Sequence, residues 1–218
     1  PFIATGRSSA ETRDIMESAN IHSGIFMNGQ VVLYQGERVY SSEIPTETVE
    51  RFHQMVKEDG YGLTAYNDKE FYLVESSSGA KDAYGFIHTN PPALNADFYK
   101  ENPINMMLFI SLPPAEEKYK VAFPNLDFLR NTPYSVDVIS KGNSKAEGIK
   151  RFLEHLNQED AETYAFGDGP NDIEMLQAVT HPVAMENALP VLKEIAEFIT
   201  TNNTDNGIVN GLKHYGLI

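Results

Sequence analysis

The sequence predicts an α/β fold: a core with a doubly wound parallel sheet, and an α+β domain inserted into it. Two observations support this prediction. Short apolar strands alternate with helical segments over residues 1–44 and again over residues 140–218, and that alternation is typical of parallel sheets. Between them, residues 45–139 are richer in strands and interrupt the alternation. At roughly 100–200 residues per domain, 218 residues can form two small domains.

The first core segment, residues 1–44, begins with a short buried strand that ends in Thr5-Gly6-Arg7. A helix over 9–19 and a second buried strand over 25–27 follow. Asn28-Gly29 ends that strand, and Gln35-Gly36 separates two strands of a hairpin, 31–34 and 37–40.

The inserted segment, residues 45–139, opens with a helix over 46–59, because Val49, Phe52 and Val56 recur at helical spacing. Residues 79–103, with the Pro91-Pro92 pair, are expected to be irregular, and a short helix is expected after Pro113-Pro114. The predicted strands of this segment cover residues 62–66, 70–74, 104–110, 126–130 and 136–139.

The last segment, residues 140–218, contains the clearest helix, over 144–156. Ser144 and Glu147 have the spacing of a capping box, and an apolar stripe runs through the helix. Further strands are predicted at 163–166, 182–185 and 198–200, and further helices at 172–178, 190–197 and 208–215.

Composition excludes several classes of function. Lys and Arg number 17 and Asp and Glu 31, giving a formal charge of −14, which argues against nucleic-acid binding through phosphate contacts. Cysteine is absent, which excludes disulfide scaffolds and thiolate sites and fits a cytoplasmic location. No stretch approaches the ~18 apolar residues of a membrane span.

The strongest candidate site is the loop Gly167-Asp168-Gly169-Pro170-Asn171-Asp172, which follows a buried strand. Ligands of parallel sheets bind beyond the carboxyl ends of the strands, and Asp168 lies at such an end. Two carboxylates four residues apart suit a hard cation such as Mg²⁺. The alternative is an ordinary βα loop in which an aspartate caps the helix.

Two further segments carry donors for a phosphate group. Lys145 opens the helix 144–156, where the free N–H groups attract anions but a cation is unfavourable for the helix dipole. Thr5-Gly6-Arg7 places a hydroxyl, a backbone N–H and a guanidinium directly after a strand. Taken alone, these residues also have ordinary structural explanations. Lys145 would be a solvated lysine, Thr5 a helix cap and Arg7 a surface charge. Asn28-Gly29 favours a hairpin turn, although its asparagine can also contact a ligand.

Taken together, these motifs resemble the Cof-type phosphatases of the haloacid dehalogenase-like superfamily over essentially the whole chain. The motifs that carry the resemblance are Ala4-Thr5-Gly6-Arg7, Asn28-Gly29, Ser144-Lys145-x-x-Gly148, Gly167-Asp168-Gly169-x-Asn171-Asp172-x-x-Met175-Leu176 and Val183-Ala184-Met185-x-Asn187-Ala188. The resemblance implies a doubly wound core with a mobile cap, and Mg²⁺-dependent hydrolysis of phosphate esters through an aspartyl-phosphate.

The resemblance also implies roles for individual residues. Thr5 would be the phosphate-binding hydroxyl, and Lys145 the cation that neutralises the phosphoryl group. Asp168 would be a direct Mg²⁺ ligand, and Asp172 a direct or outer acidic partner. The expected phosphate or substrate contacts also include Gly6, Arg7, Asn28 and Asn171.

The main departure of the sequence from the family pattern is that the family's first motif, D-x-D-x-T, occurs nowhere in it; a smaller one is Glu186, where the family commonly has glycine. That motif carries the nucleophile and the general acid–base, and its segment supplies the central strand of the sheet. A shortened N-terminus, a misassigned start and a genuine non-catalytic relative each explain this. We favour a shortened N-terminus, because Thr5, Lys145, Asp168 and Asp172 are all present.

Two classes of function remain open on the sequence alone. The first is a Mg²⁺-dependent phosphatase for a small phosphorylated metabolite, with sugar phosphates as the leading class, although the 218-residue chain alone would be inactive. The second is a non-catalytic module that binds phosphate or a partner. A phosphomutase of the same superfamily is a third reading. The sequence identifies neither the individual substrate nor the oligomeric state.

Overall fold

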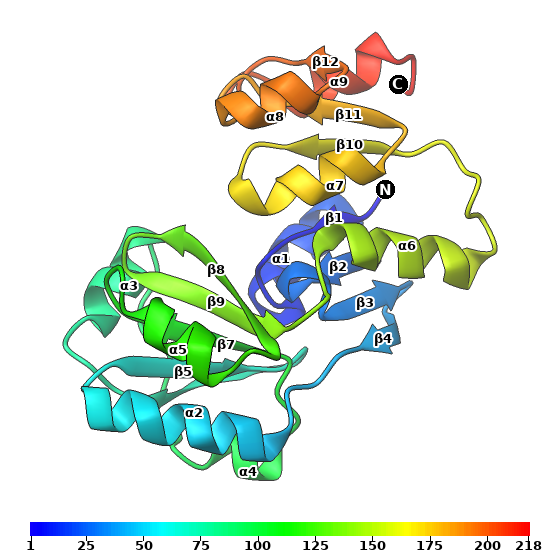
Figure 1. The fold of residues 1–218 in the computed structure, drawn as a ribbon. Coiled ribbons are helices and arrows are strands. Elements are labelled where there is room, and N and C mark those ends of the chain that lie inside the picture. Colours follow the sequence, from blue (N-terminus) through cyan, green and yellow to red (C-terminus); the bar gives the residue numbers. More distant parts are fainter. The chain divides into compact units, whose positions relative to one another are not determined.

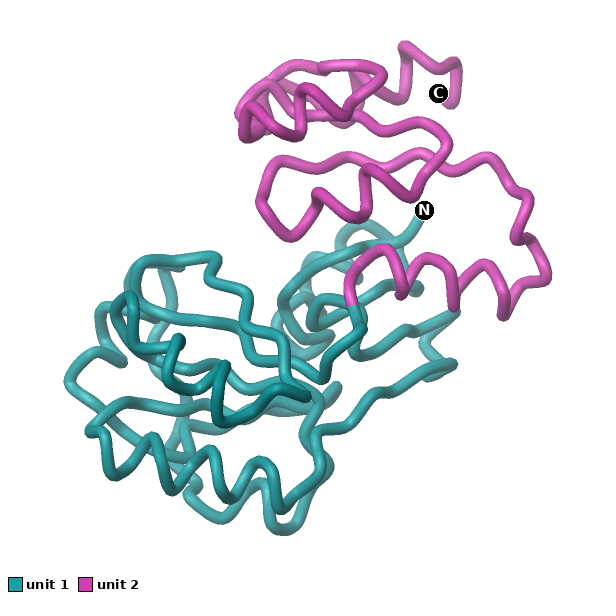
Figure 2. Tube along the Cα trace, in the orientation of Figure 1, with its two compact units in different colours: residues 1–143 teal, residues 144–218 magenta.

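A computed structural model describes all residues from Pro1 to Ile218 (Figure 1). The chain forms two compact units, residues 1–143 and residues 144–218, coloured separately in Figure 2. The first unit holds a four-stranded and a five-stranded sheet, and the second holds a three-stranded sheet. Parallel strands, helices between them and a separate α+β sheet confirm the predicted fold class. The predicted segment boundaries after residues 44 and 139 stay a prediction.

The four-stranded sheet has the order β1-β2-β3-β4. Strands β1 (Ile3–Ala4) and β2 (Gly24–Phe26) are parallel and are connected by helix α1 (Ser9–Ala19). The antiparallel strands β3 (Val31–Tyr34) and β4 (Glu37–Ser41) extend the sheet. Ser8 and Glu11 form a capping box that fixes the start of α1.

The five-stranded sheet has the order β6-β5-β7-β9-β8 and is antiparallel throughout. One face is covered by helices α2 (Thr46–Asp59) and α5 (Glu116–Ala122), whose Phe52 and Tyr119 are fully buried against it. Its strands are β5 (Gly62–Tyr66), β6 (Phe71–Glu75), β7 (Met106–Ile110), β8 (Leu126–Thr132) and β9 (Ser135–Ser140). This core is rich in aromatic rings, and its Phe52 and Phe109 meet edge to face at 5.6 Å.

Residues 79–103 are not irregular throughout, as the sequence predicted. They contain helices α3 (Ala80–Phe86) and α4 (Phe98–Glu101). Both helices are too short for an apolar repeat to be distinguished from chance, and α3 contains a glycine. Their buried side chains, among them Tyr84 and Phe98, pack against the five-stranded sheet.

The two sheets of the first unit share a hydrophobic cluster. Phe26, Met27 and Val31 from the four-stranded sheet and its loop pack with Tyr66, Met106 and Ile139 from the five-stranded sheet. This cluster brings the loop after β2 to the open face of the five-stranded sheet. The packing therefore places residues far apart in sequence around the turn that follows β1.

The second unit has the parallel order β10-β11-β12. Its strands are β10 (Tyr164–Gly167), β11 (His181–Ala184) and β12 (Phe198–Ile199), and its helices are α6 (Lys145–Leu156), α7 (Ile173–Ala178), α8 (Pro190–Ile195) and α9 (Gly207–His214). Because the strands are parallel, the loops after β10 and β11 lie at the same edge of this sheet. None of the chain's helices combines the length and the apolarity needed to cross a membrane.

Candidate functional site

In the first unit, the turn after β1 is tied to the loop after β2 by backbone hydrogen bonds. Asn28 N donates to Thr5 O at 3.1 Å, and Met27 N donates to Arg7 O at 3.0 Å. The Thr5 hydroxyl accepts from Arg7 N at 3.1 Å, and the Arg7 side chain is exposed. The turn thus holds a hydroxyl, backbone groups and an exposed guanidinium in one fixed place.

Asn28 has the hairpin role that the sequence favoured, and its contact with a ligand stays a prediction. It lies in a 3-10 turn, Met27–Gly29, with a left-handed φ of 54°, and this turn joins the antiparallel strands β2 and β3. The hairpin is therefore confirmed. The fully buried side chain also points to the five-stranded sheet, where its Nδ2 donates to Asp137 Oδ2 at 3.0 Å.

Sequence reasoning missed Asp137 and its neighbour Asn131. Asn131 Nδ2 donates to the same oxygen of Asp137 at 3.0 Å. The signal was present in the strand pattern: Asp137 is the one charged residue between the buried Val136 and Val138 of β9. An aspartate at that position points to the sheet face opposite the valines.

In the second unit, Lys145 forms a buried ion pair with Asp172. Its Nζ lies 2.6 Å from Asp172 Oδ1, and the two residues are only 6% and 5% exposed. Lys145 is the first residue of α6, after the N-cap Ser144, whose side chain accepts from Glu147 N. Lys145 is therefore not a solvated lysine, which was the alternative left open by the sequence.

The second oxygen of Asp172 organises the loop after β10. Asp172 Oδ2 accepts from the backbone N–H groups of Asp168 at 2.9 Å and Gly169 at 3.0 Å. The loop can close this tightly because residue 167 is glycine: a Cβ there would lie 2.7 Å from the Cβ of Asp172. One carboxylate thus joins the lysine to the backbone that carries Asp168.

The side chain of Asp168 is exposed and is held by the loop after β11. Asn187 Nδ2 donates to Asp168 Oδ2 at 2.8 Å, and Asn187 Oδ1 accepts from Asn203 N at 3.1 Å. Asp168 Oδ1 accepts no hydrogen bond from the chain. Asn171 lies in the same loop, in the turn Pro170–Asp172, and is half-buried.

Each unit therefore gathers its own set of predicted residues. Thr5, Gly6, Arg7 and Asn28 come together in residues 1–143, and Lys145, Asp168, Asn171 and Asp172 come together in residues 144–218. The chain contains no group of three or more His, Asp or Glu side chains placed to hold a metal ion. Of the two predicted carboxylates of the second unit, Asp168 is exposed and Asp172 is buried.

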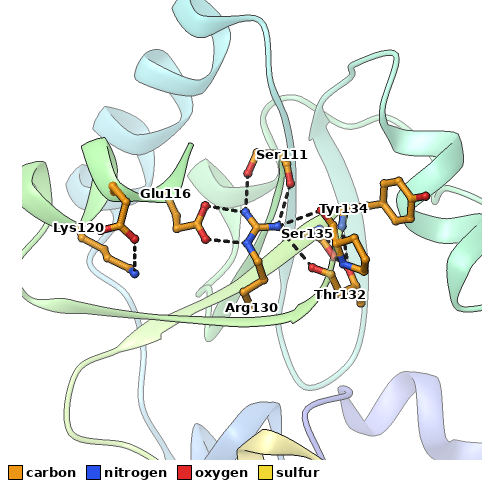
Figure 3. Close-up of polar contacts among 9 residues, drawn as sticks. Ser111, Glu116, Lys120, Arg130, Thr132, Tyr134 and Ser135 are labelled. Carbon is orange, nitrogen blue, oxygen red and sulfur yellow. Dashed lines mark hydrogen bonds and ion pairs between the residues drawn. The ribbon is translucent and has the colours of Figure 1, made fainter. Parts of the chain in front are cut away.

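A different ion pair lies in the five-stranded sheet, away from these residues. Arg130 on β8 forms a bidentate pair with Glu116 on α5, with Nε–Oε1 and Nη2–Oε2 distances of 2.6 and 2.7 Å (Figure 3). The guanidinium also donates to Ser111 O and to the carbonyl oxygens of the β8–β9 turn. The hydrogen bonds of Arg130 lower the pKa of Glu116. This pair joins elements of one domain and contacts none of the predicted site residues.

The fold and these loops define an α/β protein whose acidic and basic side chains gather at the ends of parallel strands. Comparison with known proteins makes the class specific. The chain belongs to the haloacid dehalogenase-like hydrolases, because that family's model matches residues 1–212. The resemblance to the Cof-type phosphatases that the sequence predicted is confirmed.

Individual relatives agree with this assignment. A protein named "Putative phosphatase YkrA" from Bacillus subtilis is 36% identical over 218 residues, which is all of this chain and 84% of that protein. A hypothetical protein from Geobacillus kaustophilus HTA426 has a crystal structure with a TM-score of 0.92 and 31% identity, covering 100% of this chain and 85% of that one. The subclass IIB sugar phosphatase BT4131 has a TM-score of 0.85 and 28% identity, with the same coverage.

Proposed function

We propose that this protein is a Mg²⁺-dependent hydrolase of small phosphomonoesters, with sugar phosphates as its leading substrate class. One observation carries the proposal: a buried lysine and the loop of Asp168 are joined by the single carboxylate of Asp172. Such an arrangement fixes a cation and an exposed carboxylate in place before a ligand arrives. Positioning and charge neutralisation are the main requirements of phosphoryl transfer. We also keep the cytoplasmic location, on the cysteine-free composition, as part of the proposal.

In this proposal each of the two sets contains residues suited to binding phosphate. Thr5, Gly6 and Arg7 supply a hydroxyl, a backbone N–H and a guanidinium, and Lys145 supplies the ammonium group. Asn28 and Asn171 supply further polar contacts. The backbone hydrogen bonds around Thr5 support this role, because they hold the turn in one conformation.

Asp168 is the proposed metal ligand. Its carboxylate is exposed, and Oδ1 accepts no hydrogen bond while Asn187 holds Oδ2, which suits a cation that prefers oxygen ligands and retains several waters. Both oxygens of Asp172 accept hydrogen bonds, so we assign Asp172 to the outer part of the metal site. A bound Mg²⁺ would supply charge neutralisation at the transferred phosphoryl group.

The proposal assigns no nucleophile to a residue of this chain, because no D-x-D-x-T motif occurs in the 218 residues. We therefore expect the 218-residue chain by itself to bind phosphate without turning over esters. The same observation favours the alternative function, a module that binds phosphate or a partner and does not hydrolyse it.

Hydrolysis of p-nitrophenyl phosphate with and without Mg²⁺ tests the proposal. The assay is run on the 218-residue chain and on the chain preceded by a family D-x-D-x-T segment, each with an Asp168→Asn control. We expect turnover only in the extended protein with Mg²⁺ and intact Asp168. No turnover above the Asp168→Asn control would reject the phosphatase. An aspartyl-phosphate trapped on the 218-residue chain itself would reject the non-catalytic alternative, and product analysis would separate hydrolysis from transfer to a second hydroxyl.

A further inference from the structure

An acidic side chain lies against the turn that we propose to bind phosphate. Asp137 projects from β9 of the five-stranded sheet, and its Oδ2 accepts from the amide groups of both Asn28 and Asn131, each at 3.0 Å. Asn28 belongs to the loop after β2, so this cluster links the two sheets of the first unit.

The cluster is in close contact with Gly6. A Cβ built on Gly6 would lie 3.3 Å from Asp137 Oδ2 and equally close to both side-chain polar atoms of Asn28. The Gly6 backbone, between Thr5 and Arg7, therefore faces a carboxylate and a carboxamide. Any larger residue at position 6 would press on this cluster.

A carboxylate beside a phosphate site cannot serve to bind the phosphate. Two neighbouring anions repel each other. Besides holding the amide groups of Asn28 and Asn131, the carboxylate of Asp137 therefore suits the part of the substrate that is not phosphate.

The chemistry of the cluster indicates which part that is. An ionised carboxylate only accepts hydrogen bonds, whereas each carboxamide both donates and accepts. One carboxylate and two carboxamides suit the hydroxyl groups of a polyol, which donate and accept in turn. The same carboxylate repels an alcohol that carries its own negative charge, and such repulsion is a common source of specificity.

We infer that Asp137 is a specificity-determining residue, which selects phosphate esters of neutral polyols over phosphate esters of carboxylated alcohols. Asn28 and Asn131 orient its carboxylate. The inference rests on the proposed function, because it concerns the alcohol part of a phosphomonoester bound at Thr5-Gly6-Arg7. It goes further in naming the residue and the charge class of the substrate.

Binding calorimetry on three probes tests the inference: inorganic phosphate, a hexose phosphate and phosphoglycolate. The variants are Asp137→Asn and the control Asp82→Asn, which removes the same charge from an exposed position on α3. The parent is expected to bind the hexose phosphate more tightly than phosphoglycolate. Asp137→Asn should shift that ratio toward phosphoglycolate by about fivefold or more, the effect of one nearby charge in a wet site. Its affinity for inorganic phosphate should rise or stay within about twofold, and Asp82→Asn should match the parent.

The converse variant protects the test against a folding defect in Asp137→Asn. Asn131→Asp adds a second carboxylate to the cluster at an exposed position, and it should shift the ratio away from phosphoglycolate. A ratio that neither variant moves, with folding confirmed by circular dichroism, would overturn the inference while leaving phosphate binding intact. If the folded parent binds none of the three probes, the proposed function itself fails and the inference with it.

Discussion

Two short ion pairs, one in each compact unit, have different surroundings. Lys145–Asp172 and Arg130–Glu116 both have an N–O distance of 2.6 Å. Lys145, Asp172 and Glu116 are buried, and Arg130 is half-buried. The two pairs differ in what the second oxygen of each carboxylate contacts. Glu116 returns both oxygens to the same arginine, whereas Asp172 gives its second oxygen to the backbone of Asp168 and Gly169.

A short ion pair with a buried carboxylate is therefore not by itself a sign of a functional site. Besides Glu116, the Arg130 guanidinium donates to Ser111 and to the carbonyl oxygens of the β8–β9 turn. Its contacts therefore all lie within the first unit. Asp172, by contrast, connects a cation to the loop that begins with the exposed carboxylate of Asp168. The Arg130–Glu116 pair joins a strand and a helix of one unit, and we propose that the Lys145–Asp172 pair organises a site.

Breaking the Lys145–Asp172 pair is expected to have the largest effect, on both stability and phosphate binding. Lys145→Met leaves the Asp172 carboxylate buried without its cation, which costs about 3–5 kcal/mol of unfolding free energy. It also removes the proposed phosphate-binding cation, so phosphate affinity should fall by more than about tenfold. Urea unfolding and calorimetry with inorganic phosphate measure the two effects.

The double variant Lys145→Met, Asp172→Leu separates stability from function at this pair. Replacing both charges by apolar groups should restore part of the lost stability, because no unpaired charge remains buried, while the N–H groups of Asp168 and Gly169 lose their acceptor. Phosphate affinity should not return. If affinity recovers together with stability, Lys145 acts through folding alone and the proposed site is wrong.

Breaking the Arg130–Glu116 pair should lower stability and leave phosphate affinity unchanged. Arg130→Met leaves Glu116 buried and deprives the turn carbonyls of their donor, with an expected cost of about 3–5 kcal/mol in urea unfolding. At a temperature where the variant is folded, its affinity for inorganic phosphate should stay within about twofold of the parent. A larger loss would show that the two pairs are coupled and that the contrast between them is not real.

The sequence predicted the elements of the fold where the local pattern is long or well capped. Helices α1 and α2 have the predicted ranges, 9–19 and 46–59, because a capping box and a run of apolar residues fix them locally. The short helices α3 and α4 were missed, since seven and four residues hold too little of a repeat.

The candidate site was predictable only where its residues are close in sequence. The loop from Asp168 to Asp172 was predicted from its local sequence. The Lys145–Asp172 ion pair joins residues 27 positions apart and appears only in the folded unit. Asp137 lies 109 positions from Asn28, and only the packing of one sheet against another brings them together. No local pattern carries such contacts.

Acid should weaken the Arg130–Glu116 pair over a pH range that follows from the pKa of Glu116. Arg130 holds the pKa of Glu116 below its ordinary value, so the stabilisation is fully present above that value and is lost as the pH falls through the lower, folded-state pKa. Parent and Glu116→Gln should therefore differ most near neutral pH and converge below about pH 4. Unfolding free energies measured by urea from neutral to acidic pH check this, and a difference that stays constant over the range would contradict it.

The smallest effect is expected one residue further along the same helix. Glu117 pairs with Lys120 at 2.7 Å, almost as closely as Glu116 pairs with Arg130, but the two side chains are 64% and 44% exposed. Water already solvates both charges, so Glu117→Gln should change the unfolding free energy by at most about 0.5 kcal/mol. Glu116→Gln and Glu117→Gln make the same chemical change on adjacent residues of α5, and only burial and the shape of the partner differ. Equal losses in urea unfolding would mean that burial does not govern these pairs, and the reasoning applied to Lys145 and Asp172 would lose its basis.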